Sequence, residues 1–450
     1  MVTPVRLASV ALALSLLLGL SGQAHATPGD TLGIGTRNIN LGGAVTADVE
    51  DVGGNYYNPA GIVRGPGLRL SLSYVSMNSA LEINGNDSNV ERMSGITLGI
   101  VAPLQIGSFR FGFGLGVHLP DQRLSRTRST IQSRPRWERY DTRPHKVFLS
   151  TNIAFRPIDW LLIGVGITFQ SPSDLQLVID GDADLFRVSS TRLRHQFEGD
   201  LTSTRYPQVG TQIIASENLS FGISWRGALN LRNRLAATVD GNVVVGSVRA
   251  PLDFSLISDS VSTYMPQQLT LGVAAHPVER LRVSMDLTWM DWSKHPSLIP
   301  TEEITLMIDL SQLPVMLDIP EEIGGRSPIP MNMRDTLVPR VGIEFDAFQN
   351  DSILVQARLG YVYEGTPFPI QRGATNFVDS DRHTISLGAG VRLSDLRPTL
   401  PGYLQLDAYF QYAYLPTRNH QKDSLVDPVG DYRAGGQQFG FGASLEVVFE

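Results

Sequence analysis

The chain has 450 residues, a formal net charge of −7, 42% hydrophobic residues and no cysteine. The lack of cysteine excludes disulfides and thiolate metal sites, and the acidic balance argues against nucleic acid as a partner. Beyond residue 26, no apolar run approaches the roughly 18 residues of a membrane-spanning helix, which excludes a helical membrane protein.

The N-terminus has the layout of a secretory signal. Arg6 supplies the positive charge, the apolar run Leu7 to Leu20 follows, and Ala24-His25-Ala26 is a small-x-small cleavage site. We therefore predict a cleaved signal peptide at residues 1–26 and a mature chain outside the cytoplasm. The alternative is an anchor that is not cleaved.

The stretch from Gly33 to Ile62 is rich in glycine, alanine and asparagine and keeps neither a helical nor a strand period. It ends on Asn58-Pro59-Ala60-Gly61, a rigid turn, because proline fixes φ and asparagine can bond its own backbone. We interpret residues 27–66 as a compact plug inside a barrel formed by residues 67–450. The alternative for the turn is a simple link into the first strand.

Apolar residues then alternate with polar ones at period 2, which a helix cannot place on one face. From Leu281 to Trp289, for example, every odd position is apolar and every even position is polar or charged. We count about fourteen such segments of about ten residues, the length of a tilted membrane strand. They lie near residues 68–76, 94–104, 109–119, 146–156, 160–170, 205–215, 219–230, 264–275, 280–292, 338–347, 352–363, 382–393, 402–414 and 437–449.

Short and long connections alternate strictly, as in outer-membrane barrels with short periplasmic turns and long extracellular loops. The long links fall near residues 77–93, 120–145, 171–204, 231–263, 293–337, 364–381 and 415–436. Aromatic residues gather at strand ends, as an interfacial girdle requires; they are Tyr74, Trp160, Trp289, Trp292, Tyr361, Tyr363, Tyr412 and Tyr414. We predict an all-β, 14-stranded antiparallel transmembrane β-barrel, a monomer in the outer membrane. Glu450 after the terminal Phe449 is a small departure from the usual last strand.

Several of these pieces resemble the FadL/TodX-type (OmpP1/FadL) outer-membrane transporters of long-chain fatty acids and hydrocarbons. The N-terminal matches to the hatch of that family are Gly35-Thr36-Arg37, Leu41 to Ala44, Asp48 to Asp51 and Asn58 to Gly61. The later matches, in the same order, are Trp289 to Ser293, Pro339 to Gly342, Ala357 to Tyr361, Thr366-Pro367, Asp381-Arg382 and Ser386 to Gly390. The likeness covers nearly all of the mature chain.

The resemblance implies a lumen closed by an N-terminal hatch, with Gly42, Gly43, Asn58, Pro59 and Ala60 as its residues here. Substrates would enter an apolar groove among the loops near 171–204 and 231–263, reach a pocket against the hatch, and leave sideways through a gap at a kinked third strand.

The third strand carries Gly112, Gly114 and Gly116 on its inward face. Glycine in a strand often marks a bend or the close approach of another backbone. We therefore predict the lateral opening there, with the hatch resting on this glycine face. The alternative is that the glycines only make room in a crowded lumen.

By alternation Arg340, Arg358 and Arg382 point into the barrel, and so does Arg392. A desolvated fatty acid carboxylate needs a charge-assisted partner, so the first three are our ligand-binding candidates. The alternative is pairing with lumen or hatch carboxylates, namely Glu344, Asp286, Asp48 or Asp51.

No metal-binding histidine pair and no GxSxG motif occurs, so we expect no enzyme, no cofactor and no metal site. Seven arginines between Arg123 and Arg143 form one basic loop, which can meet lipopolysaccharide phosphates. The predicted function is passive uptake of hydrophobic small molecules, long-chain fatty acids by default. The rivals are an adhesin, phage receptor or envelope protein without transport, and a general porin.

Overall fold

The computed structural model describes residues 33–65, 67–107, 109–122, 134–141, 147–170, 173–184, 192–201, 204–245, 248–297, 301–308, 329–394, 400–425 and 427–449, with 396 and 398. The predicted signal peptide lies outside these residues. Among them, no helix is both long enough and apolar enough to cross a membrane.

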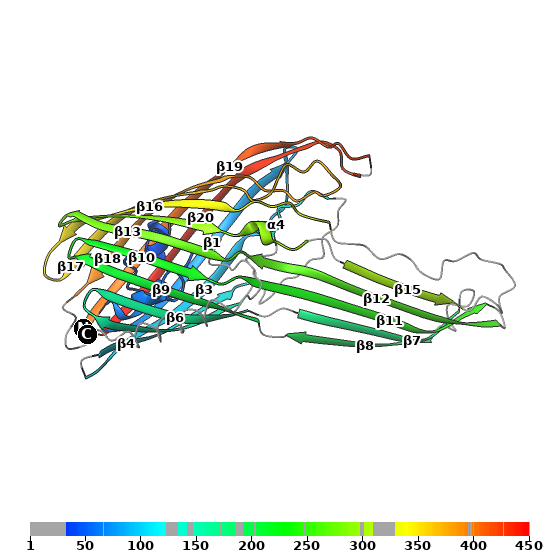
Figure 1. Cartoon of the computed structure of the whole chain (residues 1–450), viewed down its shortest axis with the longest axis horizontal. Helices are drawn as coiled ribbons and strands as arrows, with labels where there is room; N and C mark the ends of the chain where they lie inside the picture. Colours follow the sequence, from blue (N-terminus) through cyan, green and yellow to red (C-terminus); the bar gives the residue numbers. More distant parts are fainter. Residues whose placement is uncertain are drawn as a thin grey trace, which may run out of the picture.

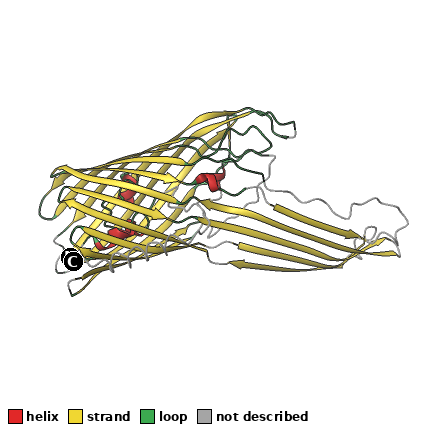
Figure 2. Cartoon of the chain, in the orientation of Figure 1, coloured by secondary structure: helices red, strands yellow, loops and turns green. Residues whose placement is uncertain are grey.

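Fourteen antiparallel strands of the described chain close into a barrel (Figures 1 and 2). They are β1 (Leu68–Ile83), β3 (Met93–Ile106), β4 (Phe109–Pro120), β5 (Phe148–Ile158), β6 (Leu161–Gln170), β9 (Thr204–Ser216), β10 (Leu219–Arg226), β13 (Gln268–Val278), β14 (Leu281–Met290), β16 (Thr336–Gln349), β17 (Ile353–Glu364), β18 (Arg382–Leu393), β19 (Gly402–His420) and β20 (Tyr432–Phe449). β1 pairs with both β20 and β3, which closes the ring, and the two-residue β2 (Asn86–Asp87) extends β1. The fourteen-stranded antiparallel barrel is confirmed.

The alternation sorts side chains between the lipid side and the lumen. On β1 the side chains of Leu70 and Leu72 are 38% and 49% exposed, whereas Arg69 and Ser73 are 2% and 3% exposed. An apolar band therefore faces outward and a polar wall faces inward, as a transmembrane barrel requires.

Residues 33–65, which we call the luminal segment, lie inside this barrel (Figure 1). The segment contains α3 (Thr36–Asn40), η1 (Val52–Asn55) and η2 (Pro59–Val63). η2 packs on β4, β5, β6 and β9, and α3 packs on the opposite wall formed by β17, β18 and β19. The luminal segment therefore spans the barrel from one side to the other.

A second, five-stranded sheet projects beyond the end of the barrel that carries the long connections (Figure 1). Its strands, in spatial order, are β15 (Thr301–Ile308), β12 (Val248–Met265), β11 (Leu229–Val245), β7 (Ser173–Asp184) and β8 (Arg192–Leu201). We predicted loops at residues 171–204, 231–263 and 293–337, and the structure has these strands there instead. These connections carry their own alternation of apolar and polar residues. The hairpins β7–β8 and β11–β12 then join into one sheet, because β11 pairs in parallel with β7.

Two apolar clusters fill the mouth of the lumen at the end of the barrel from which the five-stranded sheet projects. One joins Trp137 and Tyr140, around the short helix α4 (Glu138–Asp141), to Leu81, Leu415 and Tyr432. The other contains Tyr264, Met290, Trp292, Met331, Met333, Phe368 and Phe377. Trp292, at the start of η4 (Trp292–Lys294), is only 2% exposed. The prediction that Trp292 belongs to the interfacial girdle was therefore wrong, because loop residues bury it inside the mouth.

Candidate functional site

The barrel wall around the luminal segment is made largely of glycine. Gly99, Gly164, Gly222, Gly342 and Gly388 lie on five different strands, and a Cβ at any of them would collide with the luminal segment. Several are directly paired with further glycines, as in Gly164↔Gly210, Gly222↔Gly272 and Gly342↔Gly360. This glycine belt lets the segment's backbone approach the wall closely.

Two asparagines of the luminal segment bond to backbone carbonyls of the wall, and Asn58 also bonds within the segment. The amide of Asn58 donates to the carbonyls of Thr46 (2.7 Å) and Thr211 (3.0 Å), and its oxygen accepts from the Ala60 N–H (3.1 Å). The amide of Asn55 donates to the carbonyls of Ile100 and Leu115, at 3.3 and 3.2 Å. Both side chains are buried, so these bonds fix η1 and η2 to the wall.

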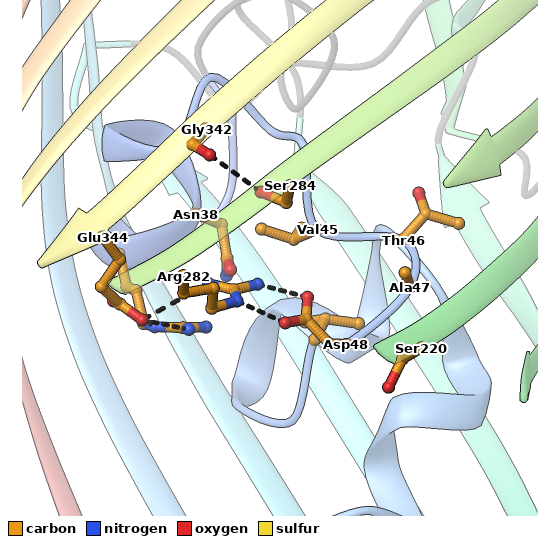
Figure 3. A network of polar contacts seen from close by, with 12 residues as sticks. Asn38, Val45, Thr46, Ala47, Asp48, Ser220, Arg282, Ser284, Gly342 and Glu344 are labelled. Carbon is orange, nitrogen blue, oxygen red and sulfur yellow. Dashed lines mark hydrogen bonds and ion pairs between the residues drawn. The ribbon is translucent and has the colours of Figure 1, made fainter. Parts of the chain in front are cut away.

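Charged groups fix the opposite side of the luminal segment (Figure 3). Glu344 of β16 accepts from Arg37 at 2.8 and 2.9 Å and from Arg358 at 2.6 Å. Arg282 of β14 forms a bidentate pair with Asp48 and reaches Glu344 at 3.4 Å. We call these five residues the anchor network. All except Arg37 are at most 6% exposed, so their mutual pairing is what makes their burial tolerable.

A carboxylate of β14 fixes the middle of the luminal segment. Asp286 accepts from the backbone N–H groups of Val45 and Thr46, at 3.1 and 3.0 Å.

Burial of Tyr57 within the same segment raises the pKa of its phenol to about 12, so the hydroxyl stays neutral at physiological pH. Burial lowers the pKa of Arg37, but Glu344 and then Asp51 outweigh this and hold it well above its usual value.

The five predicted hatch residues all lie in the luminal segment, at two separate turns. Gly42 and Gly43 have φ of +64° and +73°, which glycine alone adopts without strain, and end the turn after α3. Pro59 is the first residue of η2 and Ala60 is fully buried beside it. Asn58 is the N-cap of the same helix.

The glycine face of the third barrel strand lies directly against the luminal segment. A Cβ at Gly112 or Gly114 would come within 2.8 or 2.6 Å of Ile62, and one at Gly116 would lie 3.3 Å from the Cβ of Asn55. In this conformation the pairing of the strand is not interrupted at these glycines. β4 pairs with β3 from Ile106↔Phe109 to Gly95↔Pro120 and with β5 from Arg110↔Arg156 to His118↔Phe148, without a register shift.

The three candidate arginines are divided between two places. Arg340 and Arg382 line a cavity of about 80 Å³ between the luminal segment and the apolar mouth, together with Gly42 and Gly43. Arg358 does not reach this cavity, because it belongs to the anchor network and also pairs with Asp407. Arg392 lies beyond the same network, with its guanidinium 4.3 Å from the ring centre of Tyr403.

The cavity arginines also differ in their partners. Arg382 pairs with Glu364 at 2.8 Å. Arg340 bonds to the Thr288 hydroxyl, and no carboxylate of the described residues lies within ion-pair distance of it. Of these two arginines, Arg340 is therefore the better able to bind an anionic group.

The lumen is closed on both sides of the cavity. At the mouth Arg139 pairs with Glu364 and with Asp379 (3.2 Å), and its guanidinium lies 5.4 Å from the ring centre of Trp292. Arg136 pairs with Glu138 at 2.9 Å. These two members of the predicted basic loop therefore bind protein carboxylates. Of the other five, only Arg134 lies within the described residues.

On the side of the short turns a second cavity, of about 300 Å³, borders the anchor network. Its walls include Arg37, Asp48, Arg64, Arg282 and Glu344. The walls on this side are mainly charged and polar, with Leu281 and Leu354 among them, whereas the mouth is built largely of aromatic and aliphatic side chains.

Sequence reasoning did not find the apolar mouth. Its residues come from connections without a period, such as Trp137, Tyr140, Phe368 and Phe377. The signal was the presence of large apolar side chains inside long loops, where an extracellular loop of a barrel is normally polar.

Replacing a belt glycine should loosen the luminal segment without unfolding the barrel. At Gly222 an added methyl group would overlap the Thr46 carbonyl, an overpacking that costs about 1–3 kcal/mol. We expect Gly222→Ala to speed hydrogen exchange of the Val45 and Thr46 amides by roughly tenfold. Gly116→Ala, with its nearest contact at 3.3 Å, is the matched control and should change exchange little. Equal exchange in both variants would show that the belt does not position the segment.

These features define a class: an outer-membrane β-barrel whose lumen is occupied by its own N-terminal segment. The model of the family described as outer membrane protein transport protein (OMPP1/FadL/TodX) matches residues 30–446. The chain therefore belongs to this family and is an outer-membrane transport protein.

A curated relative is alkane uptake protein A of Marinobacter nauticus, 23% identical over 473 aligned residues that cover 100% of this chain and 97% of the relative. Among solved structures, a Pseudomonas aeruginosa FadL homologue has a TM-score of 0.54 at 14% identity and covers 92% of this chain and 98% of that one. The toluene transporter TodX of P. putida has a TM-score of 0.52 at 15% identity, covering 93% and 99%. These structures show the shared fold.

Proposed function

We propose that this protein is a passive uptake channel for hydrophobic small molecules, long-chain fatty acids and alkanes above all. The observation that carries the proposal is the apolar mouth, which leads to a cavity bordered by the luminal segment. The entrance of a water-filled pore is lined by polar side chains, whereas this entrance contains Tyr264, Trp292, Phe368 and Phe377. The printed functions of the curated relative and of TodX, alkane uptake and toluene transport, support the same substrate class.

We propose that the luminal segment is the hatch and must move for transport. The cavity of about 80 Å³ has room for several water molecules but not for a long acyl chain. The described conformation is therefore a closed one. Gly42 and Gly43, which border the cavity at the end of a short helix, place the hatch within reach of a ligand.

We propose further that substrate leaves sideways through the wall. An apolar molecule moving straight on would have to displace the anchor network, whose charges cannot be left buried without partners. At β4 the inner surface of the wall includes glycine backbone that lies against Asn55 and Ile62 of the luminal segment. Exit there requires both ladders of β4 to part, because the wall is closed in this conformation.

If Arg340 binds the carboxylate of a substrate, its replacement should affect the uptake of acidic substrates but not of neutral ones. We expect Arg340→Gln to lower the uptake of a labelled long-chain fatty acid about tenfold, the effect of losing one charge-assisted hydrogen bond. Hexadecane uptake should stay unchanged, because an alkane has no group for the guanidinium to bind. Arg382→Gln is the matched control, since Glu364 already neutralises that charge.

The proposal as a whole is tested by binding and uptake together. The purified protein should bind a labelled fatty acid or alkane, and a strain lacking the gene should lose uptake. Absence of binding across fatty acids, alkanes and aromatics would contradict a transport function. An equal loss of fatty acid and alkane uptake in Arg340→Gln would mean that Arg340 supports the hatch instead of the ligand.

A further inference from the structure

The five-stranded sheet that projects from the barrel has one apolar face. The strand register places Ile179 of β7, Val239 of β11 and Phe254 of β12 side by side, so they point to the same side of the sheet. The next row contains Leu177, Ala237, Leu256 and Ile304, again directly paired across four strands. The apolar surface therefore runs across the sheet and along it.

The opposite face carries most of the charged side chains of the sheet, together with Val178, Ile257 and the exposed Met307. Asp180, Asp240 and Asp253 are paired across three strands on that side. Arg194 pairs with Asp180 at 2.8 Å while its side chain remains 85% exposed, and Arg249 pairs with Asp182 at 3.2 Å while 65% exposed. Such exposed ion pairs contribute little to stability. They keep this face in water, so the sheet is amphipathic.

Among the described residues, no second layer of protein buries the apolar face. Phe197 on edge strand β8 is 65% exposed, and Leu235 on the inner strand β11 is 38% exposed. Val239 and Phe254, in the middle of the sheet, are only half-buried, and neither belongs to a buried core cluster of the described residues. Where β12 enters the mouth of the barrel, by contrast, Tyr264 is buried to 3% exposure. A packed layer would bury the central residues in the same way.

We propose that this face adsorbs to the surface of a liquid hydrocarbon droplet and holds the barrel mouth at the oil–water boundary. The face offers nothing for a specific protein partner to bond. Its charged or ionisable exceptions are at the margins, His195 on the edge strand and Glu302 near the barrel. Protein interfaces of stable complexes carry a polar rim and several hydrogen bonds, whereas an apolar liquid requires only apolar area.

The shape of the sheet fits the same occupant. β12 has 18 residues, so it reaches roughly 60 Å at the usual strand rise, with its inner end at the mouth of the lumen. A one-layer sheet of this kind can lie flat on a boundary, apolar side in the oil and charged side in the water, as interfacial helices do. The proposal rests on the proposed function only in that the droplet would contain the substrate.

The test uses the full-length protein in nanodiscs and hexadecane droplets, with flotation of protein on the droplets as the readout. Val239→Glu/Phe254→Glu places two charges on the apolar face at one cross-strand pair. Thr238→Glu/Ser255→Glu places the same two charges at the adjacent pair, on the charged face. We expect the first variant to lose flotation about tenfold or more and the second to float like the parent chain. Phe197→Glu, at an exposed edge, should weaken flotation by itself.

Folding and transport are measured on the same variants. Heat-modifiable gel migration reports the folded barrel, and uptake of hexadecane, supplied below its solubility limit to cells that carry each variant, reports the channel. We expect both to match the parent chain in all variants, because the lumen is untouched. Equal flotation of both double variants would overturn the proposal, as would a change from dimer to monomer in the apolar-face variant with unchanged flotation. Equal binding to phospholipid vesicles would assign the face to membranes instead. Loss of dissolved-hexadecane uptake in every sample, the parent included, would overturn the proposed function and leave the flotation result standing.

Discussion

Replacing Glu344 by glutamine is expected to release the luminal segment from the barrel wall. Glu344 is the carboxylate that Arg37, Arg282 and Arg358 share, at 2.8, 3.4 and 2.6 Å. Glutamine keeps the size but removes the charge, and removing one partner from a buried ionic network costs about 3 kcal/mol or more. Asp48 and Asp407 still hold Arg282 and Arg358, so the loss falls mainly on Arg37 and hence on α3.

The measurement is hydrogen exchange of residues 36–40 together with ion conductance in a planar bilayer. A cost of about 3 kcal/mol corresponds to exchange faster by on the order of a hundredfold. Conductance should rise in parallel, because the segment no longer seals the lumen. Asp346→Asn on the same strand is the matched control, since its carboxylate accepts only from Gln356 in the described structure, at 2.8 Å. If the two variants exchange alike, the anchor network does not hold the segment.

The barrel could be predicted because lipid imposes a strict rule on its strands. Every backbone group must be paired and every second side chain must face hydrocarbon. A segment such as Leu281 to Trp289 is therefore predicted as a transmembrane β-strand. The glycines of the belt can be seen in the sequence, but the sequence does not show that they lie at the same height in the barrel. That Gly342 stands beside Gly360, and Gly222 beside Gly272, follows only from the strand register.

Register also explains the outcome for the arginines. Alternation placed Arg340, Arg358 and Arg382 in the lumen without showing what lies across the strand. Glu344 is directly opposite Arg358, and Glu364 is directly opposite Arg382, so both arginines are neutralised. Opposite Arg340 stands Asp286, whose carboxylate bonds to the luminal segment instead. The sequence contained all six residues but not their pairing.

The five-stranded sheet was missed for a different reason. Beyond the membrane no lipid forces alternation, and long links in barrels are ordinarily loops. Leu252, Phe254 and Leu256 do alternate, and they pair with the neighbouring strand β11 and with β15. The hairpins join into one sheet only through β11 and β7, which lie far apart in the chain. The parallel pairing of β11 with β7 has no local signal, and neither does the burial of Trp292 in the mouth.

The second large effect is expected from a disulfide that locks the luminal segment to the third barrel strand. The Cβ of Asn55 lies 3.3 Å from the Cβ position of Gly116, just below the 3.5–4.5 Å that is typical of disulfides. The natural chain has no cysteine, so Asn55→Cys/Gly116→Cys creates the one thiol pair present. Oxidation would fix η1 against β4, where we propose that substrate leaves.

The matched control is Gln411→Cys/Gly440→Cys. There the Cβ of Gln411 lies 3.2 Å from the Cβ position of Gly440, and both residues belong to paired wall strands, β19 and β20. Its disulfide has nearly the same geometry and redox chemistry but leaves the luminal segment free. We expect oxidised and reduced forms of this control to transport equally.

The most direct test of the hatch is therefore the uptake of labelled fatty acid and of hexadecane by cells carrying Asn55→Cys/Gly116→Cys, before and after reduction. We predict that uptake of both substrates falls on the order of tenfold or more in the oxidised form and recovers when the disulfide is reduced. The reason is that a luminal segment fixed to the wall cannot move aside to let substrate pass. Full uptake by the oxidised, correctly inserted protein would contradict the account, since substrate would then pass without any movement of the luminal segment.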